Sequence, residues 1–424
     1  MADNVQLKEI ENILEHFIPM AKNTIGKDIT LDRMKTIMEV VGNPQHQIKI
    51  IHVAGTSGKT STSYYLANLL TLSGKKVGLT VSPHIDKITE RIQIDMQPIS
   101  SSSFLELIKE FIVLLETSNI EPTYFELLIA FSYWYFAKAG VDYAVIETGL
   151  GGLQDSTNVA NNSDKICVIT DIGIDHTHVL GNTIKEIAKQ KAGIIYKGNQ
   201  VIAYDQSSEV SEILREQVGS VKAKLSLYVQ NEIERAFINE PWFVGLSNFQ
   251  KRNWLLAYEA FKYVCIRDNF VMNSRVAQES TEITIPGRME IIKLRNKTVI
   301  LDGAHNEQKM QTFVSSIQSK YPEIKTRVIH SIKESKDYES TIKFLLPITD
   351  KLILTSYEGF HGLPIPTEDL KRSAKVTGFD NVSVESKPES ALKMFLESED
   401  SVCIVTGSFY LVSQMKQIIR DMDY

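Results

Sequence analysis

Residues 52–62 read His-Val-Ala-Gly-Thr-Ser-Gly-Lys-Thr-Ser-Thr. The segment Ile48–Val53, which leads into this stretch, is rich in β-branched side chains and is typical of a buried strand. Between positions 65 and 72, apolar residues recur at the spacing of an α-helix. A strand, a glycine-rich turn, Lys-Thr and a helix are the parts of a phosphate-binding loop. The stretch therefore predicts an α/β fold built around a nucleotide site.

Each part of this loop has a chemical role. Glycines at 55 and 58 allow backbone amides to turn toward a polyphosphate, and the helix N-terminus adds partial positive charge. We expect Lys59 to reach the β- and γ-phosphates and the Thr60 hydroxyl to hold Mg²⁺. The residues expected to hold nucleotide here are Gly55, Thr56, Ser57, Gly58, Lys59, Thr60 and Ser61. Val53 replaces the first glycine of the full pattern, so an ordinary Ser/Gly-rich turn with a solvated lysine is the alternative.

Composition narrows the class of protein. A chain of 424 residues is long enough for two or three domains, and its net charge of -6 gives no reason to expect nucleic acid or an anionic membrane. The 3 cysteines are odd in number and widely spaced, which predicts a reducing compartment. No signal peptide is visible, and the apolar segment Tyr124–Ala137 is too short to span a bilayer and carries Glu126. We expect a cytoplasmic protein.

The rest of the chain alternates strands with helices. A helix is expected from about Leu7 to Val41, and buried strands are expected near 77–81, 142–147, 165–170 and 200–203. The segment Thr284–Arg288 breaks the periodicity, after which strands recur near 299–301, 326–330, 351–355 and 402–406. Such alternation favours largely parallel sheets. We therefore expect a phosphate-loop nucleotide-binding domain in residues 1–285 and a smaller Rossmann-like α/β domain in residues 286–424.

Two groups of polar residues follow predicted strands of the first domain. Glu147 ends a buried strand at the edge where parallel sheets bind ligands, which makes it a candidate for Mg²⁺. The residues Asp171, Asp175, His176 and His178 follow the next strand, which we expect to neighbour the strand of Glu147, so that Glu147 and His176 share one Mg²⁺. The spacing of these four residues fits a metal cluster and a hydrogen-bonded loop equally well.

Taken together and in order, a series of motifs carries a family likeness. The motifs are His-Val-Ala-Gly-Thr at 52–56, Ser-Pro-His at 82–84, Glu90-Arg91, Phe125-Glu126, Glu-Thr-Gly-Leu-Gly-Gly at 147–152, Asp155, Thr157-Asn158, Asp175-His176, Leu180-Gly181, Lys-Ala-Gly-Ile at 191–194, Pro-Gly-Arg at 286–288, Asp-Gly-Ala-His-Asn at 302–306 and Gly-Ser-Phe-Tyr at 407–410. Over nearly its whole length the chain resembles the folylpolyglutamate synthase/dihydrofolate synthase family, a branch of the Mur-ligase-like ATP-dependent amide ligases.

The resemblance implies roles for particular residues. It implies that Ser82, Glu147 and His176 bind Mg²⁺, and Lys191 falls where members carry a carbamylated lysine that orders metal and substrate. The positions that hold nucleotide in the family correspond to Asn253, Arg288, Asp302 and His305. Phe125 and Asp155 align with positions that line the pterin side of the cleft. With Lys59, we expect Lys191 and His176 to be catalytic.

The resemblance also implies a reaction. A folate or dihydropteroate carboxylate attacks the γ-phosphate of ATP, and the amine of L-glutamate then attacks the acyl phosphate. No protein nucleophile is required, in agreement with the lack of a recognisable Ser-His-Asp or Cys-His signature. We expect a monomer with small-molecule partners only, without nucleic acid or membrane.

Some positions depart from the family pattern. Ser57 replaces the usual Asn, Thr60 a Gly, and Leu153 an Arg, while Gln190 and Phe249 stand where Glu and His are common. Thr60 and Leu153 leave open a Mur-like ligase that joins another amino acid to another acid. A nucleotide-binding module without catalysis is the third reading. The retention of Glu147, His176 and Lys191 disfavours it.

Overall fold

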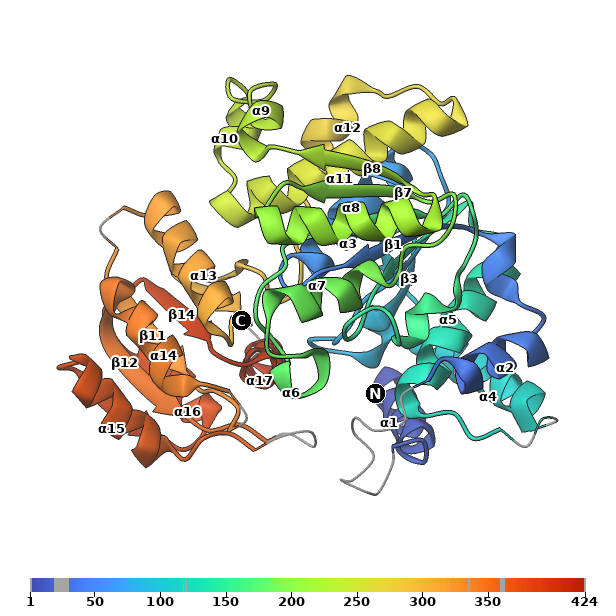
Figure 1. The fold of residues 1–424 in the computed structure, drawn as a ribbon. Coiled ribbons are helices and arrows are strands. Elements are labelled where there is room, and N and C mark those ends of the chain that lie inside the picture. The colour runs from blue at the N-terminus through green and yellow to red at the C-terminus, as the bar shows by residue number, and fades with distance from the viewer. Residues whose placement is uncertain are drawn as a thin grey trace. The chain divides into compact units, whose positions relative to one another are not determined.

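The computed structural model describes residues 2–18, 30–116, 118, 120–322, 324–334, 336–358 and 363–422. Contacts within the chain divide it into two compact units, shown with their elements in Figure 1. The first unit comprises Met1–Phe243 and Arg252–Ile283, and the second comprises Val244–Lys251 and Thr284–Tyr424.

Within the described residues, the first unit contains an 8-stranded sheet in the order β4-β3-β2-β5-β1-β6-β7-β8. Its strands are β1 (Lys49–Ala54), β2 (Val77–Thr80), β3 (Ile92–Ile94), β4 (Gln97–Pro98), β5 (Tyr143–Glu147), β6 (Ile166–Ile169), β7 (Gln200–Tyr204) and β8 (Lys224–Tyr228). All neighbouring pairs from β2 to β8 are parallel, whereas β3 and β4 add an antiparallel edge. The central strand β1 leads directly into the glycine-rich loop, so this loop lies at the middle of the carboxyl edge of the sheet.

Helices cover the sheet. They are α1 (Ala2–Glu15), α2 (Asp32–Val40), α3 (Lys59–Leu72), α4 (Ser101–Glu116), α5 (Tyr124–Ala139), α6 (Thr177–Leu180), α7 (Ile184–Ala192), α8 (Ser208–Val221), α9 (Gln230–Glu234), α10 (Pro241–Val244), α11 (Asn248–Asp268) and α12 (Ser274–Glu279), with 3-10 turns at Pro44–Gln47, Ile88–Arg91 and Ser156–Val159. Apolar residues of α2, α4 and α5 share one core with β1 and β5, and those of α7 and α8 share another with β6 and β7. Figure 1 shows α8 running alongside β7 and β8 at that end of the sheet.

The expected helix from Leu7 to Val41 is wrong. The structure has α1 ending at Glu15 and α2 beginning at Asp32, while residues 19–29 lie outside the described residues. The sequence places Pro19 after Ile18, and a proline disfavours the helical conformation of the residue before it. The apolar periodicity of the sequence therefore extends past Glu15, where the first helix ends.

The second unit contains, within the described residues, a 6-stranded sheet in the order β13-β12-β11-β14-β10-β9. Its strands are β9 (Glu290–Leu294), β10 (Lys297–Asp302), β11 (Thr326–His330), β12 (Thr349–Thr355), β13 (Val382–Glu385) and β14 (Val402–Thr406). Its helices are α13 (Glu307–Lys320), α14 (Tyr338–Ile342), α15 (Thr367–Thr377), α16 (Pro388–Leu396) and α17 (Phe409–Asp421), with a 3-10 helix at Lys343–Ile348. Only β9 runs antiparallel to its neighbour among these strands. The expected α/β fold with mostly parallel sheets is confirmed.

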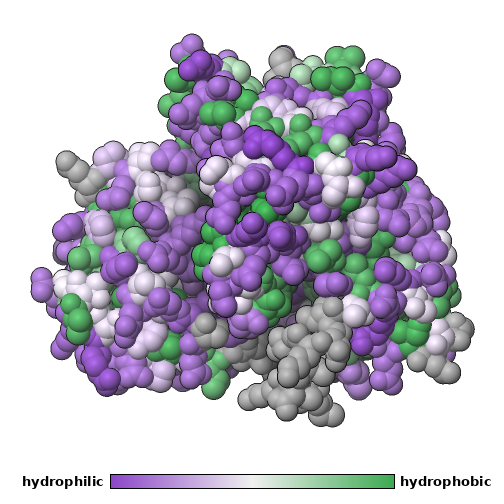
Figure 2. All heavy atoms as spheres, in the orientation of Figure 1, coloured by the Kyte–Doolittle hydropathy of each residue, from purple (hydrophilic) through white to green (hydrophobic). Residues whose placement is uncertain are grey.

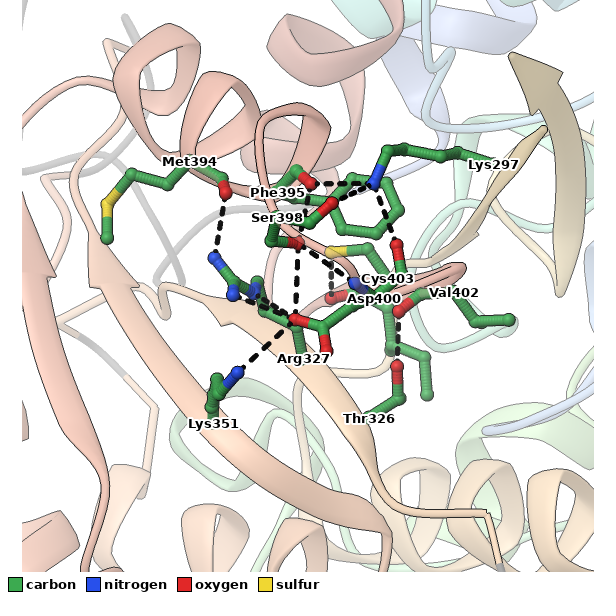
Figure 3. Close-up of polar contacts among 11 residues, drawn as sticks. Lys297, Thr326, Arg327, Lys351, Met394, Phe395, Ser398, Asp400, Val402 and Cys403 are labelled. Atoms are coloured by element: carbon green, nitrogen blue, oxygen red, sulfur yellow. Dashed lines mark hydrogen bonds and ion pairs between the residues drawn. The ribbon is translucent and has the colours of Figure 1, made fainter. Parts of the chain in front are cut away.

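A polar cluster fixes the amino edge of the second sheet (Figure 3). The ammonium group of Lys297 donates to the carbonyl oxygens of Phe395, Ser398 and Asp400, at 3.2, 2.7 and 2.9 Å. Arg327 forms an ion pair of 2.7 Å with the Asp400 carboxylate. These contacts tie the turn after α16 to the starts of β10 and β11. The cluster is therefore structural, and the carboxyl ends of the same strands lie at the opposite edge.

Of the residues that the structure describes, no helix is both long and apolar enough to cross a membrane. Apolar residues on the visible surface are interspersed with hydrophilic ones (Figure 2).

Candidate active site

The glycine-rich loop is packed closely at both of its glycines. A Cβ atom added to Gly55 would lie 1.8 Å from the Thr170 hydroxyl, and one added to Gly58 would lie 2.3 Å from Oδ1 of Asn253. Gly58 also has a φ of 89°, in the region that favours glycine. The loop thus requires glycine at both positions, and it places Asn253 directly against the turn.

Two loop amides bond to protein. The backbone N–H groups of Thr56 and Ser57 donate to the carbonyl oxygen of Asp171, at 2.7 and 3.1 Å. This differs from a loop in which every amide points at phosphate. The N-terminal turn of α3, which begins at Lys59 and includes Ser61, is then the part of the loop that can present amides to a phosphate.

Two lysines meet at the loop. Nζ of Lys59 donates to the carbonyl oxygen of Gly55 at 3.0 Å, and Nζ of Lys191 donates to the same oxygen at 2.8 Å. Lys191 comes from α7 and is buried. The structure thus brings together two of the three side chains expected to be catalytic.

Glu147 joins the loop to the segment after β2. Its carboxylate accepts from the Thr60 hydroxyl at 2.8 Å and from the Ser82 amide at 3.2 Å. Glu147 is buried at the end of β5, where it pairs in register with Val53 of β1. Three of the four residues expected to bind Mg²⁺ are therefore in direct contact, and their carboxylate and hydroxyl oxygens are the hard donors that Mg²⁺ prefers.

His176 stands apart in topology from these three residues. It follows β6, which is separated from β5 by β1, so the expectation that Glu147 and His176 end neighbouring strands is wrong. Its side chain is 41% exposed, with Nε2 lying 3.8 Å from the Asp175 carboxylate. Within the described part of the chain, no group of three or more His, Cys, Asp or Glu side chains is placed to hold a metal ion.

Asp171 instead takes part in an ion pair that the sequence did not indicate. Its carboxylate accepts from Nε and Nη2 of Arg252 at 2.7 and 2.5 Å. The guanidinium group lies 4.1 Å from the centre of the Tyr204 ring. Arg252 directly precedes Asn253 on α11. The two hydrogen bonds from Arg252 to Asp171 therefore fix the helix at the point where Asn253 meets Gly58. A lone arginine at the start of a predicted helix carries no signal for such a contact.

The polar loop after β2 is held by its own residues. The Glu90 carboxylate accepts from the backbone amides of Ile85, Asp86 and Lys87. Arg91 donates to Nδ1 of His84 at 2.8 Å. The charged side chains of Glu90 and Arg91 therefore help to order the loop that carries Ser82.

Phe125 and Asp155 meet at Gly149. A Cβ atom at Gly149 would lie 2.4 Å from Cζ of Phe125 and 3.1 Å from Oδ2 of Asp155. Burial raises the pKa of Asp155, while hydrogen bonds from Leu150 and Thr157 act in the opposite direction. The corner combines an aromatic edge, a half-buried glycine and a buried carboxylate, which suits a flat polar ring.

The remaining nucleotide candidates form a cluster in the second unit. Asp302 ends β10 and accepts from the amides of Met289 and Ala304, both at 2.9 Å. Burial raises the pKa of Asp302 to about 6, although the Arg288 charge and these amides lower it. His305 and Arg288 both lie against the ring of Phe409, at 5.3 and 4.5 Å from its centre. The aromatic residue that joins them was not among the expected site residues.

Comparison with known protein families finds a match for each of the two units. The Mur ligase middle domain matches residues 53–240, and the C-terminal domain of dihydrofolate synthetase matches residues 287–419. The solved structure of Mycobacterium tuberculosis folylpolyglutamate synthase complexed with ADP superposes with a TM-score of 0.83 over 98% of both chains, at 24% identity. This likeness shows the fold.

Curated relatives show the family. The Saccharomyces cerevisiae dihydrofolate synthetase is 27% identical, over 92% of this chain and 98% of its own length. The Bacillus subtilis dihydrofolate synthase/folylpolyglutamate synthase is 30% identical over 417 residues, which cover 92% of this chain and 95% of the relative. Identity of that degree along almost the full length of both proteins places this chain in the dihydrofolate synthase/folylpolyglutamate synthase family of Mur-type ligases.

Proposed function

We propose that this chain joins L-glutamate to the carboxylate of a folate-type acceptor, dihydropteroate or a reduced folate, with hydrolysis of ATP. The observation that carries the proposal is the contact of Glu147 with both Thr60 of the phosphate loop and Ser82, in a chain of this family. This contact supports the proposal because it links the carboxylate to the phosphate loop and to the segment of Ser82, two sources of oxygen donors for a metal–phosphate site.

The reaction needs positioned charge and no protein nucleophile. The acceptor carboxylate attacks the γ-phosphorus of ATP, the bond from that phosphorus to the bridging oxygen breaks, and an acyl phosphate and ADP form. Lys59 stabilises the charge on the transferred group. The amine of glutamate then attacks the acyl carbon, and inorganic phosphate leaves. The chain's own contribution is to align the two reactants and to keep water from the acyl phosphate.

The donor set fits Mg²⁺. Thr60, Ser82 and Glu147 would hold the ion, and His176 is the fourth candidate. A bound Mg²⁺ would neutralise phosphate charge in the transition state. The Thr60 and Ser82 contacts orient both oxygens of the Glu147 carboxylate.

Lys191 is proposed to act as a carbamate. Its amino group is buried beside Lys59 on the same carbonyl oxygen, where a second ammonium group is electrostatically unfavourable. Carbamylation would replace this positive charge with a carboxylate that can order metal and substrate.

The two parts of the chain are proposed to divide the work. Residues 1–285 would bind the ATP phosphates and the acceptor through Phe125 and Asp155. Residues 286–424 would contribute Arg288, Asp302 and His305 to the nucleotide and would serve glutamate ligation. We propose that the enzyme acts as a monomer in the cytoplasm.

The test is phosphate release by purified protein with ATP, Mg²⁺ and L-glutamate, supplying dihydropteroate or tetrahydrofolate in turn. We expect turnover with at least one acceptor and a product heavier by one glutamyl unit, and no release when glutamate is omitted. Turnover with a different carboxylic acid and amino acid alone would overturn the proposal in favour of another Mur-like ligase. In that case Leu153, which is 42% exposed, is the first position to examine.

A further inference from the structure

A buried chain of hydrogen bonds runs from β1 to the Asp155 carboxylate. Nε2 of His52 lies 2.8 Å from the Thr157 hydroxyl, and that hydroxyl donates to Oδ1 of Asp155 at 2.5 Å. Oδ1 also accepts from the Thr157 amide at 3.0 Å, and Oδ2 accepts from the Leu150 amide at 2.7 Å. His52 and Thr157 are fully buried, so this chain lies beneath the candidate acceptor corner.

The direction of these bonds follows from counting protons. A threonine hydroxyl has one proton, and Thr157 gives it to the carboxylate, which as an anion can only accept. Thr157 must therefore accept from His52, which places the imidazole proton on Nε2. The other ring nitrogen, Nδ1, is buried and has no hydrogen-bond partner among the described residues, as expected for the nitrogen without a proton.

The surroundings of His52 keep its ring neutral. Burial lowers the pKa of His52 well below its usual range, and the nearby Lys165 ammonium group acts in the same direction. The Thr148 hydroxyl also lies 3.0 Å from Nε2. From the other side, the Tyr133 hydroxyl donates to the Thr157 carbonyl oxygen at 2.9 Å. Thr157 is thus held through both its hydroxyl and its carbonyl oxygen.

We propose that His52 is a positioning residue that acts through Thr157 to hold Asp155 as a hydrogen-bond acceptor for N–H groups of the acceptor substrate. This inference rests on the proposed function, because it assumes that the acceptor ring binds at Phe125, Gly149 and Asp155. The hydrogen bonds that Asp155 accepts from Leu150, Thr157 and Gly149 favour its ionised form and fix the plane of the carboxylate. A ligand edge that presents N–H donors is then favoured over one that presents lone pairs.

Four single variants test, by enzyme kinetics, the hydrogen bonds that link His52 through Thr157 to Asp155. His52→Asn places its amide near the position of Nδ1 and cannot reach Thr157, whereas His52→Gln extends an N–H donor toward the position of Nε2. Thr157→Val removes the hydroxyl, whereas Thr157→Ser keeps it. We expect His52→Asn and Thr157→Val to raise KM for the acceptor about tenfold, as for loss of one hydrogen bond to a charged group. KM for ATP and for glutamate should change much less, and His52→Gln and Thr157→Ser should recover most of the acceptor affinity.

Two further variants complete this kinetic test. The double variant His52→Asn/Thr157→Val should bind the acceptor no more weakly than either single variant, because both break the same chain. His46→Asn, at an exposed histidine, is the matched control and should leave all three KM values unchanged. Additive effects, or equal losses for ATP and acceptor, would show that His52 only supports the fold and would overturn the proposal.

A measurement independent of turnover separates this inference from the proposed function. In protein labelled with ¹⁵N-histidine, the His52 signal, assigned by its loss in His52→Gln, should be neutral with the proton on Nε2 at about pH 7. Thr157→Val should shift that proton resonance. A proton on Nδ1, or a charged ring, would overturn the proposed positioning role of His52 even if the enzyme is active. An inactive wild type that shows the expected tautomer overturns only the proposed substrate.

Discussion

Lys59 and Lys191 donate to one and the same oxygen atom, the carbonyl oxygen of Gly55, from helices α3 and α7. Two ammonium groups on one acceptor repel each other, and the repulsion is stronger where water is excluded. An anion near Lys59, or the loss of charge at Lys191, relieves it. This repulsion is the reason for proposing a phosphate beside Lys59 and a carbamylated Lys191.

Lys59→Ala is expected to abolish ATP turnover, with a loss of about hundredfold or more, because it removes a charge that stabilises the transferred phosphoryl group. The fold should remain intact, because Lys59 is only partly buried. The measurement is phosphate release together with thermal unfolding. Lys185→Ala, at an exposed position of α7, is the control. Near-normal turnover in a folded Lys59→Ala protein would exclude the phosphate-loop assignment.

Glu147→Gln is expected to raise the Mg²⁺ concentration needed for half-maximal activity about tenfold or more, because a neutral amide is a poor ligand for a hard cation. His176→Ala should act in the same direction if this side chain shares the ion. His178→Ala, in the short helix α6 that directly follows His176, is the control for it. A His176 variant that behaves like the His178 variant would remove His176 from the site and leave Glu147 in place.

Lys191→Ala is expected to lose most activity and to regain part of it with added formate or acetate, which would occupy the place of the carbamate. Lys189→Ala, an exposed lysine of the same helix, should need no rescue. A ¹³C-NMR signal from labelled bicarbonate bound to wild type, and absent in Lys191→Ala, gives a direct readout. Without rescue and without that signal, Lys191 acts as an ordinary lysine.

Gly58→Ala and Gly74→Ala separate backbone strain from contact with Asn253. Both glycines have positive φ, of 89° and 77°, so each substitution should cost about 1–2 kcal/mol of stability. Among the described residues, no atom lies within 4 Å of a Cβ at Gly74, whereas a Cβ at Gly58 meets Asn253. Only Gly58→Ala should therefore raise KM for ATP. Equal KM values in the two variants would argue against a nucleotide role for this contact.

Asp302→Asn should reveal the cost of burying a carboxylate. Burial raises the Asp302 pKa from 3.8 to about 6, so the folded state binds this proton more tightly than the unfolded state. The stability that the protonated group contributes is present below about pH 4 and is lost as the pH rises through about 6. Relative to Asp302→Asn, wild type should lose about 3 kcal/mol of unfolding free energy across this range. Urea unfolding of both proteins over a pH series measures the difference, and a flat difference would contradict the pKa shift.

The sequence predicted the buried parts of the fold far better than its margins. Apolar runs such as Thr326–His330 and Val402–Thr406 coincide with β11 and β14, because burial on both faces produces a continuous apolar signal. The edge strands β4 and β13 were not expected. They are short and partly exposed, so their sequences resemble loops.

The sequence predicted some parts of the candidate site and missed others, and the difference is how far apart the residues lie in the sequence. The phosphate loop is contiguous in sequence, so its residues could be named before its structure was known. The bond between Arg252 and Asp171 joins residues 81 positions apart, and that between His52 and Thr157 joins residues 105 apart. Neither pair has a local pattern, because Arg252 lies on α11 and Thr157 in a 3-10 turn, and the tertiary fold brings each of them to its partner.

Helix α11 has a consequence for how this protein can be divided. Its first residues, through Lys251, group with the second unit, where Phe249 packs on the apolar core, while the rest of the helix groups with the first. The chain therefore passes between the units three times, near residues 243, 251 and 283. A fragment that starts at residue 284 lacks Phe249, a piece of its own core. A fragment that stops at residue 243 lacks Asn253, which lies against Gly58 of the phosphate loop. Neither unit can be exchanged with that of a relative as a single cassette, so chimeras must carry two junctions around residues 244–251 in addition to the one near 283.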